Sequence, residues 1–254
     1  MSVKVYKTVL LQQVMKGRAF TEQMRPLAQS AARQKFDAAQ KQALVMFNSH
    51  PITKEIEGGG TAENISDTLH FPEAAKKGNL YSFIGFPGIS AANMGGMRTL
   101  MTAYPRLRKS GTKARRVGTD RVDFTFRTQI PSLQAFYAIT PMPWPEGGQS
   151  WAQKVETGFS NLHFYKYKQG IPGSRSGYAI QLEKWGVYLP GSYFKPKPYL
   201  SGIMGWWANE LSRHVIMTVS SIKAGRAMAG KSGKAKMRPG EAVWMNPFGT
   251  GGRG

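Results

Sequence analysis

The chain has 254 residues, with 35 Lys and Arg against 14 Asp and Glu, a formal net charge of +21. Self-repulsion on this scale destabilises a compact monomer and favours binding to polyanions. The absence of Cys excludes disulfides, thiolate catalysis and Cys-based zinc sites. A hydrophobic fraction of 41% excludes a chain that is disordered throughout.

The first 20 residues are predicted to form an N-terminal arm. They contain neither the long apolar run nor the small-residue cleavage site of a signal peptide. The whole chain lacks an apolar stretch of about 18 residues, so we expect no membrane span.

A helix is predicted from Thr21 to Asn48, with Thr21 as its N-cap and Pro26 near enough to the start to be tolerated or to set it. Pro51 ends the helix, because the residue before a proline resists the α conformation. The apolar positions recur at helical spacing: Ala28, Ala32, Phe36, Ala39, Ala43 and Phe47. This Ala-rich stripe fits either close packing against a partner helix or a good helix former.

The glycines at 58–60 and at 95–96 are predicted to border an irregular region. Residues 79–86 form a short aromatic strand candidate, closed by Pro87 and Gly88. The block from Arg98 to Arg127 holds nine Lys and Arg and two Asp. Its end, residues 122–127, alternates apolar and polar residues, which predicts a half-buried strand with Asp123, Thr125 and Arg127 facing solvent.

The C-terminal half is predicted to contain a loop at 141–148, a helix at 150–159 capped by Ser150, a loop at 170–177 and a strand at 178–183. A last helix is expected from about Pro198 to Ile222, with Val215 and Val219 in its apolar stripe. Residues 223–254 form a basic, Gly-rich extension that is normally disordered on its own.

These elements predict an α+β fold. A small, mostly antiparallel sheet is packed by a long N-terminal helix, a middle helix and a long C-terminal helix, with an extended basic loop and tail. The predicted domains are the arm 1–20, the α+β body 21–222 and the extension 223–254.

One segment matches an enzyme motif. Residues 225–232 read G-x-x-x-x-G-K-S, the phosphate-binding loop of many NTPases. The helix that such a loop requires is not predicted, because the following residues have no apolar face and meet Pro239. The four His are scattered without metal-ligand spacing, and no catalytic carboxylate pair is indicated. We therefore expect no enzymatic activity, no cofactor and no metal.

Basic clusters are the stronger signal, and they predict sequence-independent contact with phosphates or an acidic partner. The first cluster is expected to be an exposed, mobile hairpin or loop, and the second lies in the extension. The predicted contact residues are Arg106, Arg108, Lys109, Lys113, Arg115, Arg116, Lys223, Arg226, Lys231, Lys234, Lys236 and Arg238. Aromatic residues predicted at an oligomer interface are Phe83, Phe86, Trp144, Trp151 and Trp206.

Several segments together resemble virion neck proteins of tailed bacteriophages, the loose group of head–tail joining, tail-completion and tail-terminator proteins. The resemblance covers roughly residues 45–215. It is carried by residues 50–58 (HPITKEIEG), 79–86 (NLYSFIGF), 142–144 (MPW), 150–151 (SW), 156–160 (ETGFS), 174–177 (SRSG) and 194–200 (FKPKPYL).

The resemblance implies a structural virion protein, assembled in the host cytoplasm, that forms a ring of six or twelve copies between portal and tail. It implies contacts with portal, connector or tail-tube proteins, and contact of the basic arms with packaged DNA. The alternative is a sequence-independent nucleic-acid-binding component of another large assembly, such as a ribosome-associated protein.

Overall fold

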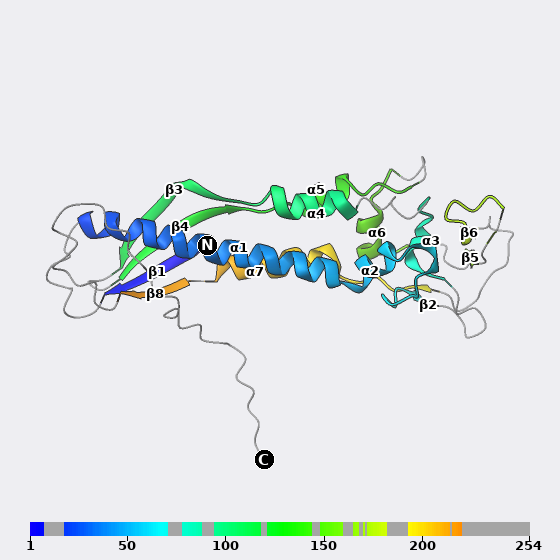
Figure 1. The fold of residues 1–254 in the computed structure, drawn as a ribbon, viewed down its shortest axis with the longest axis horizontal. Coiled ribbons are helices and arrows are strands. Elements are labelled where there is room, and N and C mark those ends of the chain that lie inside the picture. The colour runs from blue at the N-terminus through cyan, green and yellow to red at the C-terminus, as the bar shows by residue number, and fades with distance from the viewer. Residues whose placement is uncertain are drawn as a thin grey trace, which may run out of the picture. The chain divides into compact units, whose positions relative to one another are not determined.

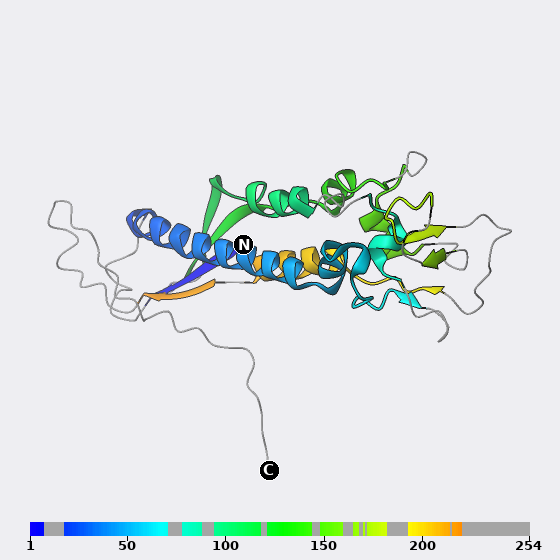
Figure 2. The same cartoon turned by 45° about the vertical axis from the view of Figure 1, so that its right-hand side comes forward.

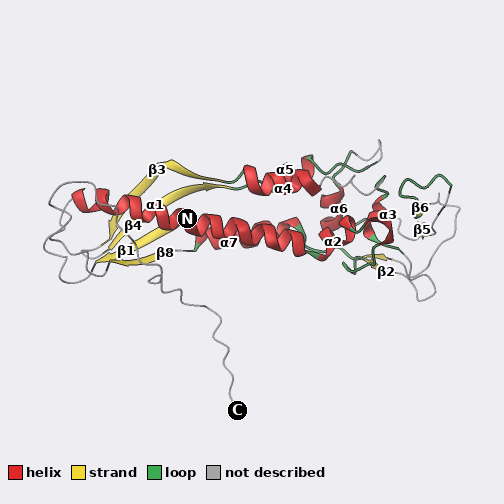
Figure 3. Cartoon of the chain, in the orientation of Figure 1, coloured by secondary structure: helices red, strands yellow, loops and turns green. Residues whose placement is uncertain are grey.

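A computed structural model describes residues 1–7, 18–70, 78–87, 94–117, 121–143, 148–159, 165–167, 170, 172–181, 193–213 and 215–219. The chain divides into two compact units, Met1–Val219 and Ser220–Gly254, and the second lies wholly outside the described residues. The first unit is mixed helix and sheet (Figures 1 and 3), which confirms the α+β class.

The helices are α1 (Arg18–Ser49), α2 (Pro51–Glu57), α3 (Leu80–Ile84), α4 (Met94–Ala103), α5 (Leu133–Ala138), α6 (Trp151–Thr157) and α7 (Leu200–Ser212), with a 3-10 turn at Gly59–Thr61. The strands are β1 (Ser2–Lys7), β2 (Leu69–His70), β3 (Arg106–Val117), β4 (Arg121–Gln129), β5 (Tyr165–Tyr167), β6 (Ala179–Gln181), β7 (Tyr193–Phe194) and β8 (Val215–Val219).

The main sheet has the strand order β3-β4-β1-β8. The pairs β3–β4 and β4–β1 are antiparallel, and the pair β1–β8 is parallel. Figure 2 shows β1 in blue beside β8 in orange, although they lie at opposite ends of the described chain. The described residues also form two small antiparallel pairs, β2–β7 and β5–β6.

Helix α1 contributes to two hydrophobic clusters, because its buried stripe runs along most of its length. Its first half packs against β4 in the small core, which comprises Met24, Ala28, Ala32, Val122, Phe124 and Phe126. Its second half enters the large core, which joins α2, α3, α4, α5, α6 and α7 and is rich in aromatic side chains. The predicted Ala-rich stripe is therefore a packing surface within the chain.

Local signals placed several helix ends correctly. Helix α1 ends before Pro51, as predicted, and it runs through Pro26. The predicted start is wrong, because α1 begins at Arg18 and Thr21 lies inside it rather than at its N-cap. His50 then caps α2, because its Nδ1 accepts a hydrogen bond from the Ile52 amide at 3.3 Å. The Ser150 hydroxyl accepts from the Gln153 amide at 3.1 Å, which confirms the predicted cap of α6.

The strand predicted at 79–86 is wrong, because residues 80–84 form helix α3. Asn79 caps this helix by accepting from the Ser82 amide at 2.8 Å, while its amide nitrogen donates to the Gly60 carbonyl at 2.9 Å. Gly85 ends the helix in the left-handed region at φ 81°, a conformation that glycine adopts readily. Gly95 and Gly96, predicted to border an irregular region, lie in the first turn of α4.

The predicted last helix is wrong in its second half. Helix α7 ends at Ser212, and residues 215–219 form β8. Pairing with β1 explains the difference, because the parallel partner provides hydrogen bonds for the backbone of 215–219. β-Branched residues such as Val215 and Val219 also favour the strand conformation. The same pairing corrects the predicted arm, because Ser2–Lys7 lies inside the sheet, between β4 and β8.

Candidate nucleic-acid interface

The two faces of β4 are chemically different. Val122, Phe124 and Phe126 are almost fully buried against α1, whereas Thr125 and Arg127 are exposed. The alternation predicted from the sequence is therefore confirmed. The phenyl rings belong to the small core and are not available to stack on bases.

Strand pairing brings cations from β3 onto the exposed face of β4. Side chains of directly opposed residues lie on the same face of an antiparallel pair. Residues of β3 and β4 are opposed in the order Arg106 with Gln129, Arg108 with Arg127, Lys113 with Thr125, Arg115 with Asp123, and Val117 with Arg121. Lys4 of β1 lies opposite Asp123 on its other side.

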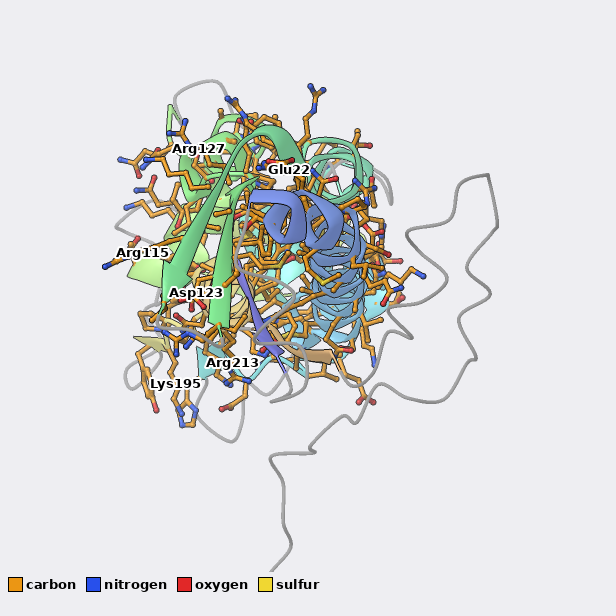
Figure 4. All side chains as sticks on the ribbon, turned by 90° about the vertical axis from the view of Figure 1, so that its left-hand side faces the viewer. Glu22, Arg115, Asp123, Arg127, Lys195 and Arg213 are labelled. Carbon is orange, nitrogen blue, oxygen red and sulfur yellow. The ribbon has the colours of Figure 1, made fainter. Side chains whose placement is uncertain are left out.

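This arrangement makes a cationic face, which we define as the exposed side chains of Arg106, Arg108, Lys113, Arg115 and Arg127. Figure 4 shows Arg115 and Arg127 reaching outward on the side of β3 and β4 that lies away from α1. The acid on these two strands, Asp123, is engaged by Arg121, with Nε 3.1 Å from Oδ1. Within the described part of the chain, the five exposed cations have no ion-pair partner.

Neutral neighbours orient one of these cations. Arg108 donates a hydrogen bond of 3.0 Å from its guanidinium to Gln129 Oε1. Gln129 in turn donates from Nε2 to the Tyr104 hydroxyl at 3.0 Å. An amide acceptor holds the guanidinium in place without cancelling its charge, so Arg108 keeps its full attraction for an anion.

The structure brings together only part of the predicted contact set. Arg106, Arg108, Lys113 and Arg115 lie on β3, so the predicted hairpin is the correct alternative to a loop. Lys109 and Arg116 belong to β3, but their side chains are not described. The contact residues predicted in the extension, which are Lys223, Arg226, Lys231, Lys234, Lys236 and Arg238, lie outside the described residues, as does the G-x-x-x-x-G-K-S motif.

The predicted oligomer interface requires a correction. Phe83, Phe86 and Trp151 are each 1% exposed in the large core. The Trp151 ring lies edge-on to Phe86, with centroids 5.6 Å apart, so these two rings pack against each other inside the chain. Trp206 is partly buried against the same core, and Trp144 lies outside the described residues.

Two cations on this side of the sheet, Arg127 and Lys4, are not among the predicted contact residues. Arg127 was placed on the solvent face of its strand but was not identified as a contact residue, and Lys4 was assigned to the arm. The alternating pattern of β4 could have identified Arg127. Only the register of β1 against β4 could have identified Lys4, because that pairing joins residues more than 100 positions apart.

The described residues contain no group of three or more His, Asp or Glu that could hold a metal ion. A cavity of about 250 Å³ beside Trp151 is lined by prolines and apolar side chains, with Thr140 as its polar member. No described helix is long and apolar enough to cross a membrane.

Two carboxylates, the buried Glu55 and the half-buried Glu156, accept hydrogen bonds from the backbone. Glu55 accepts hydrogen bonds from the Ser66 and Leu80 amides at 2.8 and 2.5 Å, and burial raises its pKa. Glu156 accepts from the Tyr199 and Ser201 amides at 3.0 and 2.6 Å at the start of α7. Both carboxylates are fixed as acceptors of backbone hydrogen bonds, which is a structural role.

Comparison with protein-family models, with curated proteins and with solved structures gives no match for this chain.

Proposed function

We propose that this chain is a non-enzymatic structural subunit whose cationic face binds the phosphate backbone of DNA. The observation that carries the proposal is the open face of β3 and β4, with five exposed cations and a single engaged carboxylate. These cations have no acidic partner among the described residues, and a polyanion would supply their counter-charge and release its condensed ions on binding.

The face favours contact with the backbone over the reading of bases. The side chains that define the face are all cations, and the exposed Tyr104 at its edge accepts a hydrogen bond from Gln129, so the face offers mainly phosphate contacts rather than a row of stacking platforms. The four strands span roughly 14 Å between outer axes, which is wider than the major groove of about 12 Å. Strand β4 is nine residues long, or roughly 26 Å, about the rise of eight base pairs.

The setting we propose is the neck or tail-completion ring of a tailed phage, with the DNA in its channel and portal, connector or tail-tube proteins as neighbours. This part rests on the resemblance of residues 45–215 to such proteins. The net charge of +21 supports it, since a large assembly containing DNA offsets self-repulsion. Localisation in the virion and a ring of six or twelve copies belong to the same proposal.

The salt dependence of DNA binding tests the cationic face. The full chain is compared with a variant carrying Gln at Arg106, Arg108, Lys113, Arg115 and Arg127, on a duplex of mixed sequence. Losing the phosphate contacts of these cations flattens the slope of log K against log salt by about 0.9 for each phosphate released, which is at most about 4.5 for five cations. A control variant carries Gln at five exposed cations elsewhere: Arg33, Lys41, Lys54, Lys195 and Arg213. Equal slopes for the two variants would overturn the assignment of the face.

The proposed setting has a separate test. Cryo-electron microscopy of the particle and native mass spectrometry of the purified chain would show a ring at the neck or tail end. A strict monomer that is absent from particles contradicts this placement. Stronger binding to RNA than to duplex DNA at physiological salt would favour the ribosome-like alternative.

A further inference from the structure

Strand β3 is interrupted in the middle of the cationic face. Arg108 is opposed to Arg127 and Lys113 to Thr125, so β3 advances five residues while β4 advances two. Residues 109–112 therefore share a single opposing position, Phe126. A bulge of this kind removes backbone groups from the regular ladder and re-aims the flanking side chains.

The bulge is bordered by a pair of like charges. Arg108 and Arg127 are directly opposed and exposed, an arrangement that destabilises a sheet. No carboxylate of the described residues lies within ion-pair distance of either side chain. Gln129 holds Arg108 in position, as described above. An unfavourable charge pair that is nevertheless oriented points to an anion that binds between the two guanidinium groups.

We propose that the bulge 109–112 and its flanking cations Arg108, Lys113 and Arg127 form a discrete site for one phosphodiester of duplex DNA. This inference rests on the proposed function and locates one point at which the cationic face contacts the phosphate backbone of DNA. Guanidinium groups bind phosphate oxygens through paired hydrogen bonds, and Lys113 adds a third positive charge. Residues 109–112 read Lys-Ser-Gly-Thr, and a glycine tolerates the irregular backbone of a bulge better than other residues do.

A double-mutant cycle on DNA affinity tests the site in the full chain. Arg108→Gln and Arg127→Gln each weaken duplex binding about tenfold, and the double variant is little weaker than either, because both side chains hold the same phosphate. The control cycle uses Arg106→Gln and Arg115→Gln, which lie on opposite sides of the bulge and whose effects multiply. If the losses in the Arg108/Arg127 cycle multiply, the two side chains do not share a phosphate, although the cationic face can still bind DNA.

Thermal stability separates a binding role from a structural one. Arg127→Gln relieves the like-charge pair, so its melting temperature equals or exceeds that of the unaltered chain while its DNA affinity falls. A fall in melting temperature equal to that of a core substitution would contradict the assignment.

Inorganic phosphate tests the site without DNA. At matched ionic strength, phosphate raises the melting temperature above its value in chloride. The increment disappears in the Arg108→Gln/Arg127→Gln variant and persists in Arg106→Gln/Arg115→Gln. If the increment is seen but duplex DNA is not bound, the proposed function fails and the site stands. Tighter binding to anionic phospholipid vesicles than to duplex DNA would overturn DNA as the source of the phosphate.

Discussion

The small core and the large core of this protein differ in what they bury and in what they leave exposed. The small core joins α1 to β4 through alanines, one methionine and three strand residues. The large core contains stacked and edge-on rings, among them Phe47, Trp151 and Tyr199. Aromatic side chains bury far more surface than alanine, so most of the stabilising burial lies in the large core.

Polar groups follow the same division. In the large core, Glu55, Asn79 and Glu156 turn inward and satisfy backbone amides or carbonyls. Beside the small core, Arg108 and Arg127 turn outward and lack acidic partners among the described residues. One region therefore stabilises the fold, whereas the other carries charge that has no acidic partner among the described residues and that an external anion would offset.

The largest expected effect lies in the large core. Trp151→Ala removes a fully buried ring that stacks on Tyr199, with centroids 6.4 Å apart. We expect a loss of about 3–5 kcal/mol in the free energy of unfolding, measured by urea denaturation. Gln153→Ala on the exposed side of α6 is the control, with a change within about 0.5 kcal/mol. A cost below about 1 kcal/mol for Trp151→Ala would break the comparison.

A smaller effect is expected at Glu55. Glu55 accepts hydrogen bonds from two backbone N–H groups, and in Glu55→Gln the side-chain NH₂ group faces one of these donors. We expect the free energy of unfolding to fall by about 1–3 kcal/mol at neutral pH. Burial raises the pKa of Glu55 above its ordinary value of 4.5. The folded chain therefore binds this proton more tightly than the unfolded chain, and the contribution of Glu55 to stability falls as pH rises from 4.5 through the raised pKa.

Urea denaturation across this pH range checks the prediction, because Glu55→Gln removes that part of the pH dependence. The control is Glu63→Gln, an exposed carboxylate in the same segment, which leaves the profile unchanged. If the Glu55→Gln profile parallels that of the unaltered chain, the raised pKa is not the cause.

The smallest effect on stability is expected on the cationic face. Lys113→Gln changes the free energy of unfolding by no more than about 0.5 kcal/mol, because the side chain is exposed and unpaired in the described structure. Its DNA-binding slope against salt becomes shallower by no more than about 0.9, the value of one phosphate contact, because Arg108 and Arg127 still hold the phosphate that Lys113 shares. A large loss of stability with an unchanged slope would reverse the roles that we assign to the two regions.

Sequence reasoning recovered the features that depend on neighbouring residues. The stripe of α1, the Ser150 cap and the two faces of β4 follow from spacing and from local hydrogen bonds. It failed at residues 79–86, where an aromatic run resembled a strand. Asn79 caps the start of the helix there, and Gly85 caps its end. The candidate site was recovered in part, since the cations of β3 were identified and their arrangement was not.

Composition and local pattern by themselves determined the α+β class, the excess of positive charge and the exposure of Arg127 on the solvent face of its strand. Only the tertiary structure decided that β1 and β8 enter the sheet, that Phe83 and Trp151 are core residues, and that Arg108 faces Arg127. The physical reason is the range of the interactions. Caps and periodicity act within a few residues, whereas register and burial depend on partners that the chain meets only on folding.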